Sequence, residues 1–215
     1  MNGVASLAGR IDAIVIGASA GGVEALSWLL PALPRSLKAA VFVVLHLPRE
    51  RPSLLVEIFQ PKCALPVREA EDKEPVEPGT VYLAPPDYHL LLDDGPQLSL
   101  SADEPVHFSR PSIDVLFESA ADLYRQRLLG ILLSGANEDG AEGAAAIQRA
   151  GGVTVVQHPD GAHSSQMPAS ALKRFAPSHV LELDGIVLLL RTLDTATPAG
   201  SGRAVGPPGY SVARP

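Results

Sequence analysis

The sequence is poor in cysteine, and its 215 residues include a single one, Cys63. A disulfide within the chain is therefore excluded, and so little cysteine is typical of a reducing compartment. We expect a cytoplasmic protein. Ala64 and Leu65 follow the thiol, which favours a buried structural role over a reactive one.

Long apolar runs and an excess of basic charge are also missing. No uninterrupted apolar stretch approaches the ~20 residues that span a bilayer, and the amino terminus lacks the pattern of a secretory signal. Lys and Arg number 17 against 24 Asp and Glu, for a net charge of -7. We therefore expect no membrane insertion, and the acidic balance argues against nucleic acid as a partner.

The remaining composition is that of an ordinary globular protein, with 46% hydrophobic and 19% charged residues. The length predicts one compact domain, which we assign to residues 1–195. Beyond Thr195 the chain is rich in Gly, Pro and Ser and poor in large apolar residues. We expect residues 196–215 to form a disordered tail or linker.

Short apolar runs alternate with helical patterns along most of the chain. This alternation predicts an α/β fold with a doubly wound, mainly parallel, Rossmann-like sheet flanked by helices. Residues 67–101, with strand-like VYLA and an Asp94-Gly95 turn signal, instead predict a small antiparallel β-ribbon outside the sheet. The expected strands are 12–17, 40–46, 128–133 and 153–156. The expected helices are 21–33, 52–58, 110–127, 141–150, one opening at 167–168, and 185–193, the last covering a sheet edge.

Two helices carry more specific expectations. In the first, Val23, Leu26 and Leu30 fall at helical spacing and predict a common apolar face. In the helix within 110–127, Ser112 is the expected N-cap, since serine often accepts a hydrogen bond from the first turn.

Reactive side chains follow three of the expected strands. Ser19 comes after the first strand, His46 closes the second, and Glu138 and Asp139 follow the strand LLGILL. In an open parallel sheet, ligands bind outside the carboxyl ends of the strands. A nucleophile, a base and two carboxylates are therefore expected along one edge.

The segment around Ser19 reads GASAG between a strand and a helix. This G-x-S-x-G pattern is typical of a sharp turn that exposes a nucleophilic serine, and His46 could take its proton while a carboxylate orients the ring. Taken singly, each residue has a simpler interpretation: Ser19 as an N-cap or phosphate-binding residue, and Asp139 as the N-cap of the next helix.

Nucleotide and metal sites fit less well. A dinucleotide fingerprint needs glycine where Ser19 stands, and an acid where the second strand ends in His46. No G-K-[ST] follows for a triphosphate. The other histidines, expected in loops or the ribbon, have no metal-ligand spacing; they are His89, His107, His158, His163 and His179. Arg49 and Arg51 could bind an acidic substrate surface or remain solvated.

Six stretches of the sequence resemble the catalytic domain of the chemotaxis protein-glutamate methylesterases, the CheB family. They occur in the family's order between about Ile14 and Lys173. The resemblance implies a parallel α/β sheet with a small antiparallel ribbon, in agreement with the independent prediction. The stretches are IVIGASAGGVEAL, VFVVLHLP, APPDYHLLL, SRPSIDVLFESAA, GILLSGANEDGAEG and QMPASALK.

The resemblance also implies a chemistry. It maps a catalytic triad onto Ser19, His46 and Asp139, and it selects Asp139 over Glu138. It implies hydrolysis of γ-glutamyl methyl esters, and in many members deamidation of glutamine, on the helical cytoplasmic part of chemoreceptors, with no metal or organic cofactor. Backbone amides at Ala20 and Ala136 are the candidates for the oxyanion hole.

The sequence departs from the family pattern at three places. Ala20 replaces a residue that is usually threonine, and Ala136-Asn137 replaces Met-Gly in the turn. An amino-terminal receiver domain, common in the family, does not precede the catalytic stretches. We therefore expect either an excised fragment of a longer protein or a free-standing domain whose activity is set by a partner, such as a receiver-domain protein. These departures leave two alternatives: a weakly active or non-catalytic signalling module that binds a methylation partner, and a small-molecule carboxylesterase.

Overall fold

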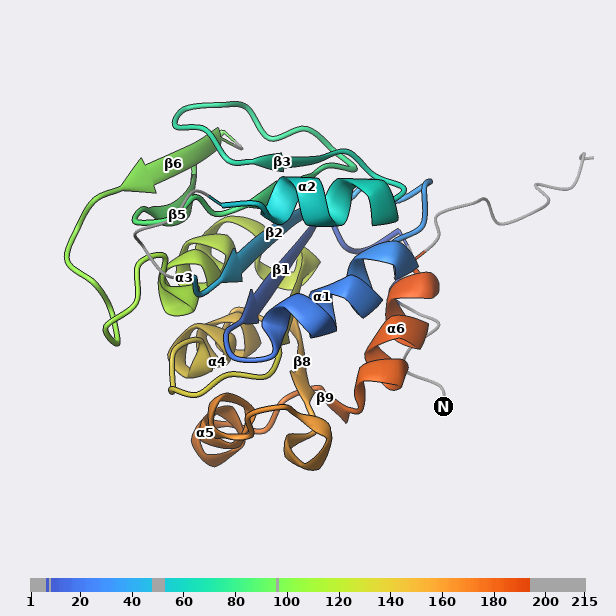
Figure 1. The fold of residues 1–215 in the computed structure, drawn as a ribbon, viewed down its shortest axis with the longest axis vertical. Coiled ribbons are helices and arrows are strands. Elements are labelled where there is room, and N and C mark those ends of the chain that lie inside the picture. Colours follow the sequence, from blue (N-terminus) through green and yellow to red (C-terminus); the bar gives the residue numbers. More distant parts are fainter. Residues whose placement is uncertain (1–6, 8, 48–52, 96, 194–215) are drawn as a thin grey trace, which may run out of the picture.

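A parallel sheet forms the centre of the molecule, in a computed structural model that describes residues 7, 9–47, 53–95 and 97–193 (Figure 1). Its seven strands have the order β3-β4-β2-β1-β7-β8-β9, and every neighbouring pair is parallel. The strands are β1 (Ala13–Ala18), β2 (Ala40–Leu45), β3 (Val67–Glu69), β4 (Val81–Leu83), β7 (Leu128–Leu132), β8 (Val153–Gln157) and β9 (His179–Leu181).

Helices cover both faces of the sheet. Strand β1 is buried along its whole length, and its alternating side chains divide between two apolar cores. Ile14 and Ile16 pack in the core shared with α1, α2 and α6, whereas Ala13 and Val15 pack in the core shared with α3, α4 and α5. The α-helices are α1 (Gly22–Leu29), α2 (Leu55–Phe59), α3 (Ile113–Tyr124), α4 (Ala141–Arg149), α5 (Gln166–Arg174) and α6 (Leu183–Arg191).

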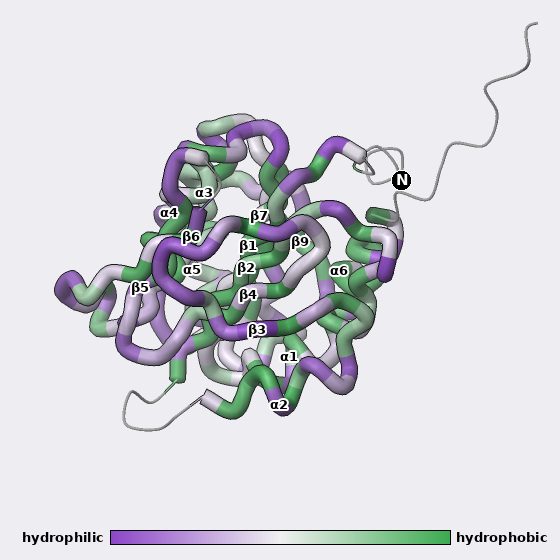
Figure 2. Tube along the Cα trace, turned by 90° about the horizontal axis from the view of Figure 1, so that it is seen from above, coloured by the Kyte–Doolittle hydropathy of each residue, from purple (hydrophilic) through white to green (hydrophobic). Residues whose placement is uncertain are grey.

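Figure 2 shows the hydrophobic strands β1 and β2 near the middle of the molecule, seen from above. Short 3-10 turns complete the chain: η2 (Leu30–Ala32), η3 (Gln60–Lys62), η4 (Arg125–Arg127) and η5 (Pro159–Gly161). Within the described part of the chain, no helix is both long and apolar enough to cross a membrane.

The expected ribbon is confirmed as a two-stranded antiparallel hairpin of β5 (His89–Asp93) and β6 (Gln97–Ser101). Gly95 lies in its turn with φ +85°, a conformation that favours glycine. The hairpin packs against α3, where the backbone N–H of Leu92 donates to Ser119 Oγ at 3.2 Å. The doubly wound α/β architecture predicted from the sequence is also confirmed.

The assignment of VYLA to the ribbon excursion is wrong. Val81–Leu83 is strand β4 of the main sheet, parallel to β2, and Val67–Glu69 adds the edge strand β3 beside it. Tyr82, a member of this segment, is fully buried and stacks on Phe42 of β2 with ring centroids 5.6 Å apart. A three-residue strand carries too few side chains to indicate which strand it will pair with.

The first helix is shorter than predicted. It ends at Leu29 and continues as the 3-10 turn η2, because Pro31 has no N–H to extend the helical ladder. Val23, expected on the apolar face with Leu26 and Leu30, is instead exposed, while those two leucines are buried.

Two smaller expectations need correction, and others fall on residues that the structure does not describe. His179 is not in a loop but opens the edge strand β9. The last helix, α6, begins at Leu183 and packs beside α1 on one face of the sheet rather than only along its edge. The tail 196–215, the two arginines after His46 and the proline expected to open α2 all lie outside the described residues.

Candidate active site

The loops after β1, β2 and β7 meet at one edge of the sheet. The order of strands reverses between β1 and β7, because the chain proceeds from β1 toward β2 on one side and from β7 toward β8 on the other. Ligand sites in such sheets lie at this switch point. Backbone hydrogen bonds join the loops: Ser19 N–H donates to Ser134 O at 2.9 Å, and His46 N–H donates to Ala18 O at 3.1 Å.

Ser19 lies in the sharp turn between β1 and α1. Gly21 is the N-cap of α1 with φ +79°, and a Cβ at this position would lie 2.4 Å from His163 Cβ. Only glycine fits both the backbone conformation and the space. The turn is closed by a 2.8 Å bond from Gly22 N–H to Ser19 O. Ser19 is thereby held at the amino-terminal end of a helix, whose dipole favours negative charge.

His46 and Asp139 are in direct contact. His46 Nε2 lies 2.8 Å from Asp139 Oδ2, with 12% of the histidine side chain and none of the aspartate side chain exposed. Since an ionised carboxylate only accepts hydrogen bonds, Nε2 carries the proton in the neutral ring. Nδ1 is then the nitrogen that can accept a proton.

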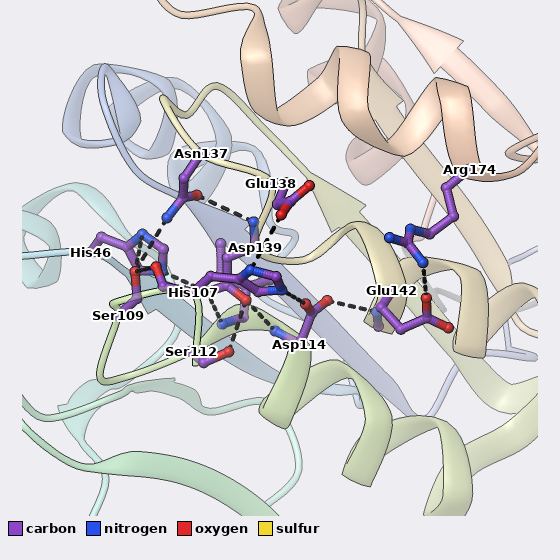
Figure 3. Close-up of polar contacts among 12 residues, drawn as sticks. His46, His107, Ser109, Ser112, Asp114, Asn137, Glu138, Asp139, Glu142 and Arg174 are labelled. Atoms are coloured by element: carbon purple, nitrogen blue, oxygen red, sulfur yellow. Dashed lines mark hydrogen bonds and ion pairs between the residues drawn. The ribbon is translucent and has the colours of Figure 1, made fainter. Parts of the chain in front are cut away.

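Asp139 also accepts hydrogen bonds from the start of α3. Its donors there are the Ser112 hydroxyl at 2.8 Å, Ile113 N–H at 2.7 Å and Asp114 N–H at 3.0 Å (Figure 3). Burial opposes ionisation of Asp139, but the bonds from His46 and from these backbone amides outweigh it, so its pKa lies below the usual 3.8. The carboxylate is therefore held ionised against His46.

The N-cap expectations are half right. Ser112 occupies the N-cap position of α3, but its hydroxyl donates to Asp139 instead of capping the helix. The alternative expectation, that Asp139 is the N-cap of α4, is wrong, because Gly140 occupies that position. The Asp139 carboxylate instead accepts hydrogen bonds from backbone N–H groups at the start of α3. Sequence position could not reveal this, because the capped helix begins 26 residues earlier in the chain.

The two adjacent carboxylates have different surroundings. Glu138 has 58% of its side chain exposed and forms an ion pair with His107, with 3.5 Å between Oε1 and Nδ1. Asp139 is fully buried against His46. The geometry therefore separates Glu138 from Asp139, a distinction that spacing alone left open.

A cavity of about 410 Å³ opens between these loops. Ser19 and His46 both line it, although within the described residues no hydrogen bond joins their side chains. The two side chains must therefore approach each other before the Ser19 hydroxyl can meet Nδ1. Other residues of the lining are His107, Phe108, Ser109 and Asn137.

Two backbone amides near Ser19 are available to a ligand. Among hydrogen bonds between described residues, none is donated by the N–H of Ala20 or of Ala136. Gly135 N–H, in contrast, is occupied by Ser164 O at 3.1 Å, and Ser134 Oγ donates to Ala20 O at 2.6 Å. These bonds fix the two turns, of which the one with Ala20 precedes α1 and the one with Ala136 lies in the loop after β7. Backbone amides without a partner in the protein can stabilise an oxyanion.

Several residues of the site were not assigned functions from the sequence. The hydroxyl of Ser109 lies 3.4 Å from His46 Nδ1, and Asn137 Nδ2 donates to the same hydroxyl at 3.3 Å. His107 lines the cavity between two carboxylates. Ser109 and His107 come from the loop between β6 and α3, whereas Asn137 comes from the loop between β7 and α4. Neither loop carries a local pattern that relates these side chains to His46.

No metal site is apparent in the part of the chain that the structure describes, since it contains no group of three or more His, Cys, Asp or Glu side chains suited to hold an ion. Cys63 is half-buried and donates to Leu30 O at 3.5 Å. Burial raises the pKa of its thiol, and this agrees with the expected structural role.

Asp114 provides a test of the site's electrostatics. It is 5% exposed, accepts Gly143 N–H at 2.7 Å and lies 3.5 Å from His107 Nε2. Burial, with a further contribution from the charge of Asp139, raises the pKa of Asp114 from 3.8 to about 6. A carboxyl whose pKa is higher in the folded than in the unfolded state stabilises the fold most at pH values below its unfolded-state pKa. This contribution to stability is lost as the pH rises through the folded-state pKa.

We therefore expect Asp114→Asn to gain stability relative to the wild type as pH rises from about 4 to 7, by up to about 3 kcal/mol. Asparagine stays neutral and retains a carbonyl oxygen for Gly143 N–H. Urea unfolding at pH 4 and pH 7 measures the free-energy difference between the two proteins. A difference that stays constant over this range would show that Asp114 ionises normally.

Known proteins resemble the chain over most of its length. The sequence model described as CheB methylesterase matches residues 14–190. A Leptospira interrogans protein, provisionally named protein-glutamate methylesterase/protein-glutamine glutaminase, is 43% identical over 183 residues, which cover 85% of this chain and 95% of that protein. A Symbiobacterium thermophilum relative of the same name is 37% identical over 80% of this chain, but the match spans only 48% of the relative.

A solved structure has the same fold. The crystal structure of the Thermotoga maritima CheB methylesterase catalytic domain matches with a TM-score of 0.80 and 31% identity, over 85% of this chain and 98% of the other. The structural likeness agrees with the arrangement of the sheet and its flanking helices. The chain belongs to the CheB methylesterase family and is a carboxylic-ester hydrolase.

Proposed function

We propose that this enzyme hydrolyses γ-glutamyl methyl esters on chemoreceptor-type signalling proteins, with Ser19 as nucleophile, His46 as general base and Asp139 as the carboxylate that orients the histidine. The proposal is carried by the 2.8 Å contact between His46 Nε2 and Asp139 Oδ2 beside a cavity that Ser19 also lines. A base held by a buried carboxylate next to a serine at a helix start is suited to acyl transfer.

In the first step, Ser19 Oγ attacks the ester carbonyl carbon while its proton passes to His46 Nδ1. The carbonyl oxygen becomes an oxyanion, for which the N–H groups of Ala20 and Ala136 are the proposed donors. Collapse of this tetrahedral intermediate breaks the bond to the methoxy oxygen. The imidazolium returns its proton to that oxygen, methanol leaves, and the glutamyl side chain remains esterified to Ser19.

In the second step, water takes the place of methanol. His46 removes a proton from the water, the resulting hydroxide adds to the acyl carbon, and the bond to Ser19 Oγ breaks as the serine regains a proton. The products are the free glutamate side chain and the resting enzyme. Asp139 remains ionised throughout, because its role is to stabilise the imidazolium and hold the ring tautomer.

Glutamine deamidation follows from the same steps with ammonia as the leaving group. The relatives from Leptospira and Symbiobacterium carry both activities in their names. We propose deamidation as a second reaction of this site, and a separate receiver-domain protein as the partner that regulates it.

Methanol release from a methylated receptor tests the proposal. We expect the purified protein to release radiolabelled methanol from a chemoreceptor fragment carrying labelled γ-methyl esters, and to act on it with a much higher kcat/KM than on a simple aryl ester. Equal preference for both substrates would favour the small-molecule carboxylesterase.

Binding without turnover would favour the alternative of a non-catalytic module. The departures at Ala20 and Asn137 motivate that alternative, because they change residues beside the nucleophile and the carboxylate. Absence of methanol release, together with saturable binding of the receptor fragment, would identify this outcome.

A further inference from the structure

Ser109 contacts the nitrogen of His46 that accepts the proton in the proposed mechanism. Its Oγ lies 3.4 Å from His46 Nδ1, while Nε2 on the opposite side of the ring is occupied by Asp139 (Figure 3). The same Oγ accepts Asn137 Nδ2–H at 3.3 Å and lies 3.4 Å from the backbone oxygen of His107. The Ser109 hydroxyl therefore accepts from Asn137 and can donate either to His46 Nδ1 or to the His107 carbonyl.

A serine hydroxyl has one proton and two acceptor lone pairs. Asn137 engages one lone pair, so the proton and the other lone pair are available to His46. With a neutral ring, the Ser109 hydroxyl donates to Nδ1. Once Nδ1 is protonated, the hydroxyl can rotate its proton toward the His107 carbonyl and accept from Nδ1–H without any movement of its oxygen.

We propose that Ser109 is a positioning residue for the reaction, which holds the His46 ring through Nδ1 until Ser19 engages that nitrogen and is itself held by Asn137. The proposal rests on the proposed function, because it takes His46 as the general base. In the resting enzyme Ser109 occupies Nδ1. When Ser19 engages His46, the Ser109 hydroxyl rotates so that its O–H donates to the His107 carbonyl, and Nδ1 becomes open.

The turn that carries Ser109 is firmly held. Val106 and Ser109 exchange backbone hydrogen bonds of 3.1 and 2.8 Å, and the two residues between them have left-handed backbones, His107 with φ +48° and Phe108 with φ +61°. Left-handed conformations of such residues cost free energy and persist where the surroundings enforce them, often at functional sites.

Side-chain contacts from several elements hold this turn. His107 lies 3.5 Å from Asp114 on α3 and 3.5 Å from Glu138 in the loop after β7. Arg110, just after the turn, binds Asp87 at 2.7 Å and the carbonyl of Ala102 at the same distance. These contacts place the Ser109 hydroxyl beside His46 independently of substrate.

Asn137 makes this arrangement specific to this chain, because the family pattern has no side chain at that position. Its Oδ1 accepts Asp139 N–H at 3.3 Å while its Nδ2 donates to Ser109. One amide thus connects the backbone of the orienting carboxylate to the residue that holds the opposite side of the imidazole. The family pattern has glycine here, and a glycine could not make either side-chain contact.

Steady-state kinetics of methanol release test the proposal. We expect Ser109→Ala to lower kcat about 5- to 10-fold, the value of one neutral hydrogen bond, with little change in KM. Ser109→Thr keeps a hydroxyl and should recover most of the rate. Asn137→Ala should lower kcat by a smaller factor, and the double variant should lose less than the product of the two factors, because both act through one hydroxyl.

Three results would overturn the proposal. A wild-type kcat in Ser109→Ala means that the hydroxyl does nothing, and a threonine variant as slow as the alanine variant means that the hydroxyl is not the important group. Ser109→Ala as inactive as Ser19→Ala means that Ser109 acts directly in the chemistry. A failure of the proposed function is distinguishable, because the wild-type protein would then release no methanol at all.

Discussion

Replacement of Ser19 by alanine is expected to lower kcat for methyl-ester hydrolysis by at least about four orders of magnitude, since loss of the nucleophile leaves only the weak assistance of the remaining site. Substrate binding should persist, because Ser19 contributes one hydroxyl to a cavity of about 410 Å³. Radiolabelled methanol release under saturating receptor measures the effect.

Ser27→Ala is the matched control for this variant. Ser27 lies on α1, and its hydroxyl accepts Lys62 Nζ at 3.3 Å on the exposed surface, outside the catalytic cavity. Its replacement should leave kcat within a factor of about two, as is usual for a surface site. If Ser19→Ala also retained the full rate, Ser19 could not be the nucleophile.

Asp139→Asn should be almost as damaging to catalysis and should also destabilise the fold. Oδ2 faces His46 Nε2 and Ile113 N–H, whereas Oδ1 faces the Ser112 hydroxyl and Asp114 N–H. An asparagine amide group must point at one of these two pairs, so a donor meets donors in either orientation. We expect kcat to fall about 10⁴-fold through loss of the correct tautomer.

The same substitution should lower the free energy of unfolding by about 2 to 4 kcal/mol, because buried donors at the start of α3 lose their acceptor. Glu138→Gln is the matched control: the side chain is 58% exposed, and it should change stability and kcat only slightly. Urea unfolding and methanol release measured on both variants separate the two effects. An Asp139→Asn protein with normal stability and rate would remove the basis for its assigned role.

Much of the fold follows from local sequence. The β-branched runs at 13–18 and 40–45 and the apolar run at 128–132 were predictable as buried parallel strands, because each is uniformly apolar and followed by a helical pattern. The three-residue strand β9 was not predicted, and the segment VYLA of β4 was predicted as a strand but assigned to the ribbon instead of the sheet. Pairing with a longer neighbour decides where such short strands lie.

The residues of the site also include some that local sequence predicts and others that depend on tertiary structure. Ser19, His46 and the pair Glu138-Asp139 could be nominated because each lies at or beyond the end of a strand that a sequence pattern predicts. The choice of Asp139 over Glu138 came from the family resemblance. The contact between Ser109 and Asn137 depends instead on how the long loop between β6 and α3, which carries Ser109, packs against the loop between β7 and α4, which carries Asn137. Contacts made 63 residues apart, as between His46 and Ser109, leave no trace in local periodicity.

The partners of Asp139 also depend on tertiary structure. A carboxylate before a helical glycine is most simply interpreted as the cap of the helix that follows. Here the close packing of α3 against α4 brings another helix start to the same carboxylate. Orientation of His46 and capping of α3 are thus properties of one buried group.

Identification of the serine that becomes acylated tests the central claim most directly. The protein would be treated with an organophosphonate that reacts with activated serines, digested, and mapped by mass spectrometry. We predict an adduct on Ser19 that is absent from Ser19→Ala and that forms far more slowly in Asp139→Asn. An adduct on Ser109, whose hydroxyl lies 3.4 Å from His46 Nδ1, would contradict the account.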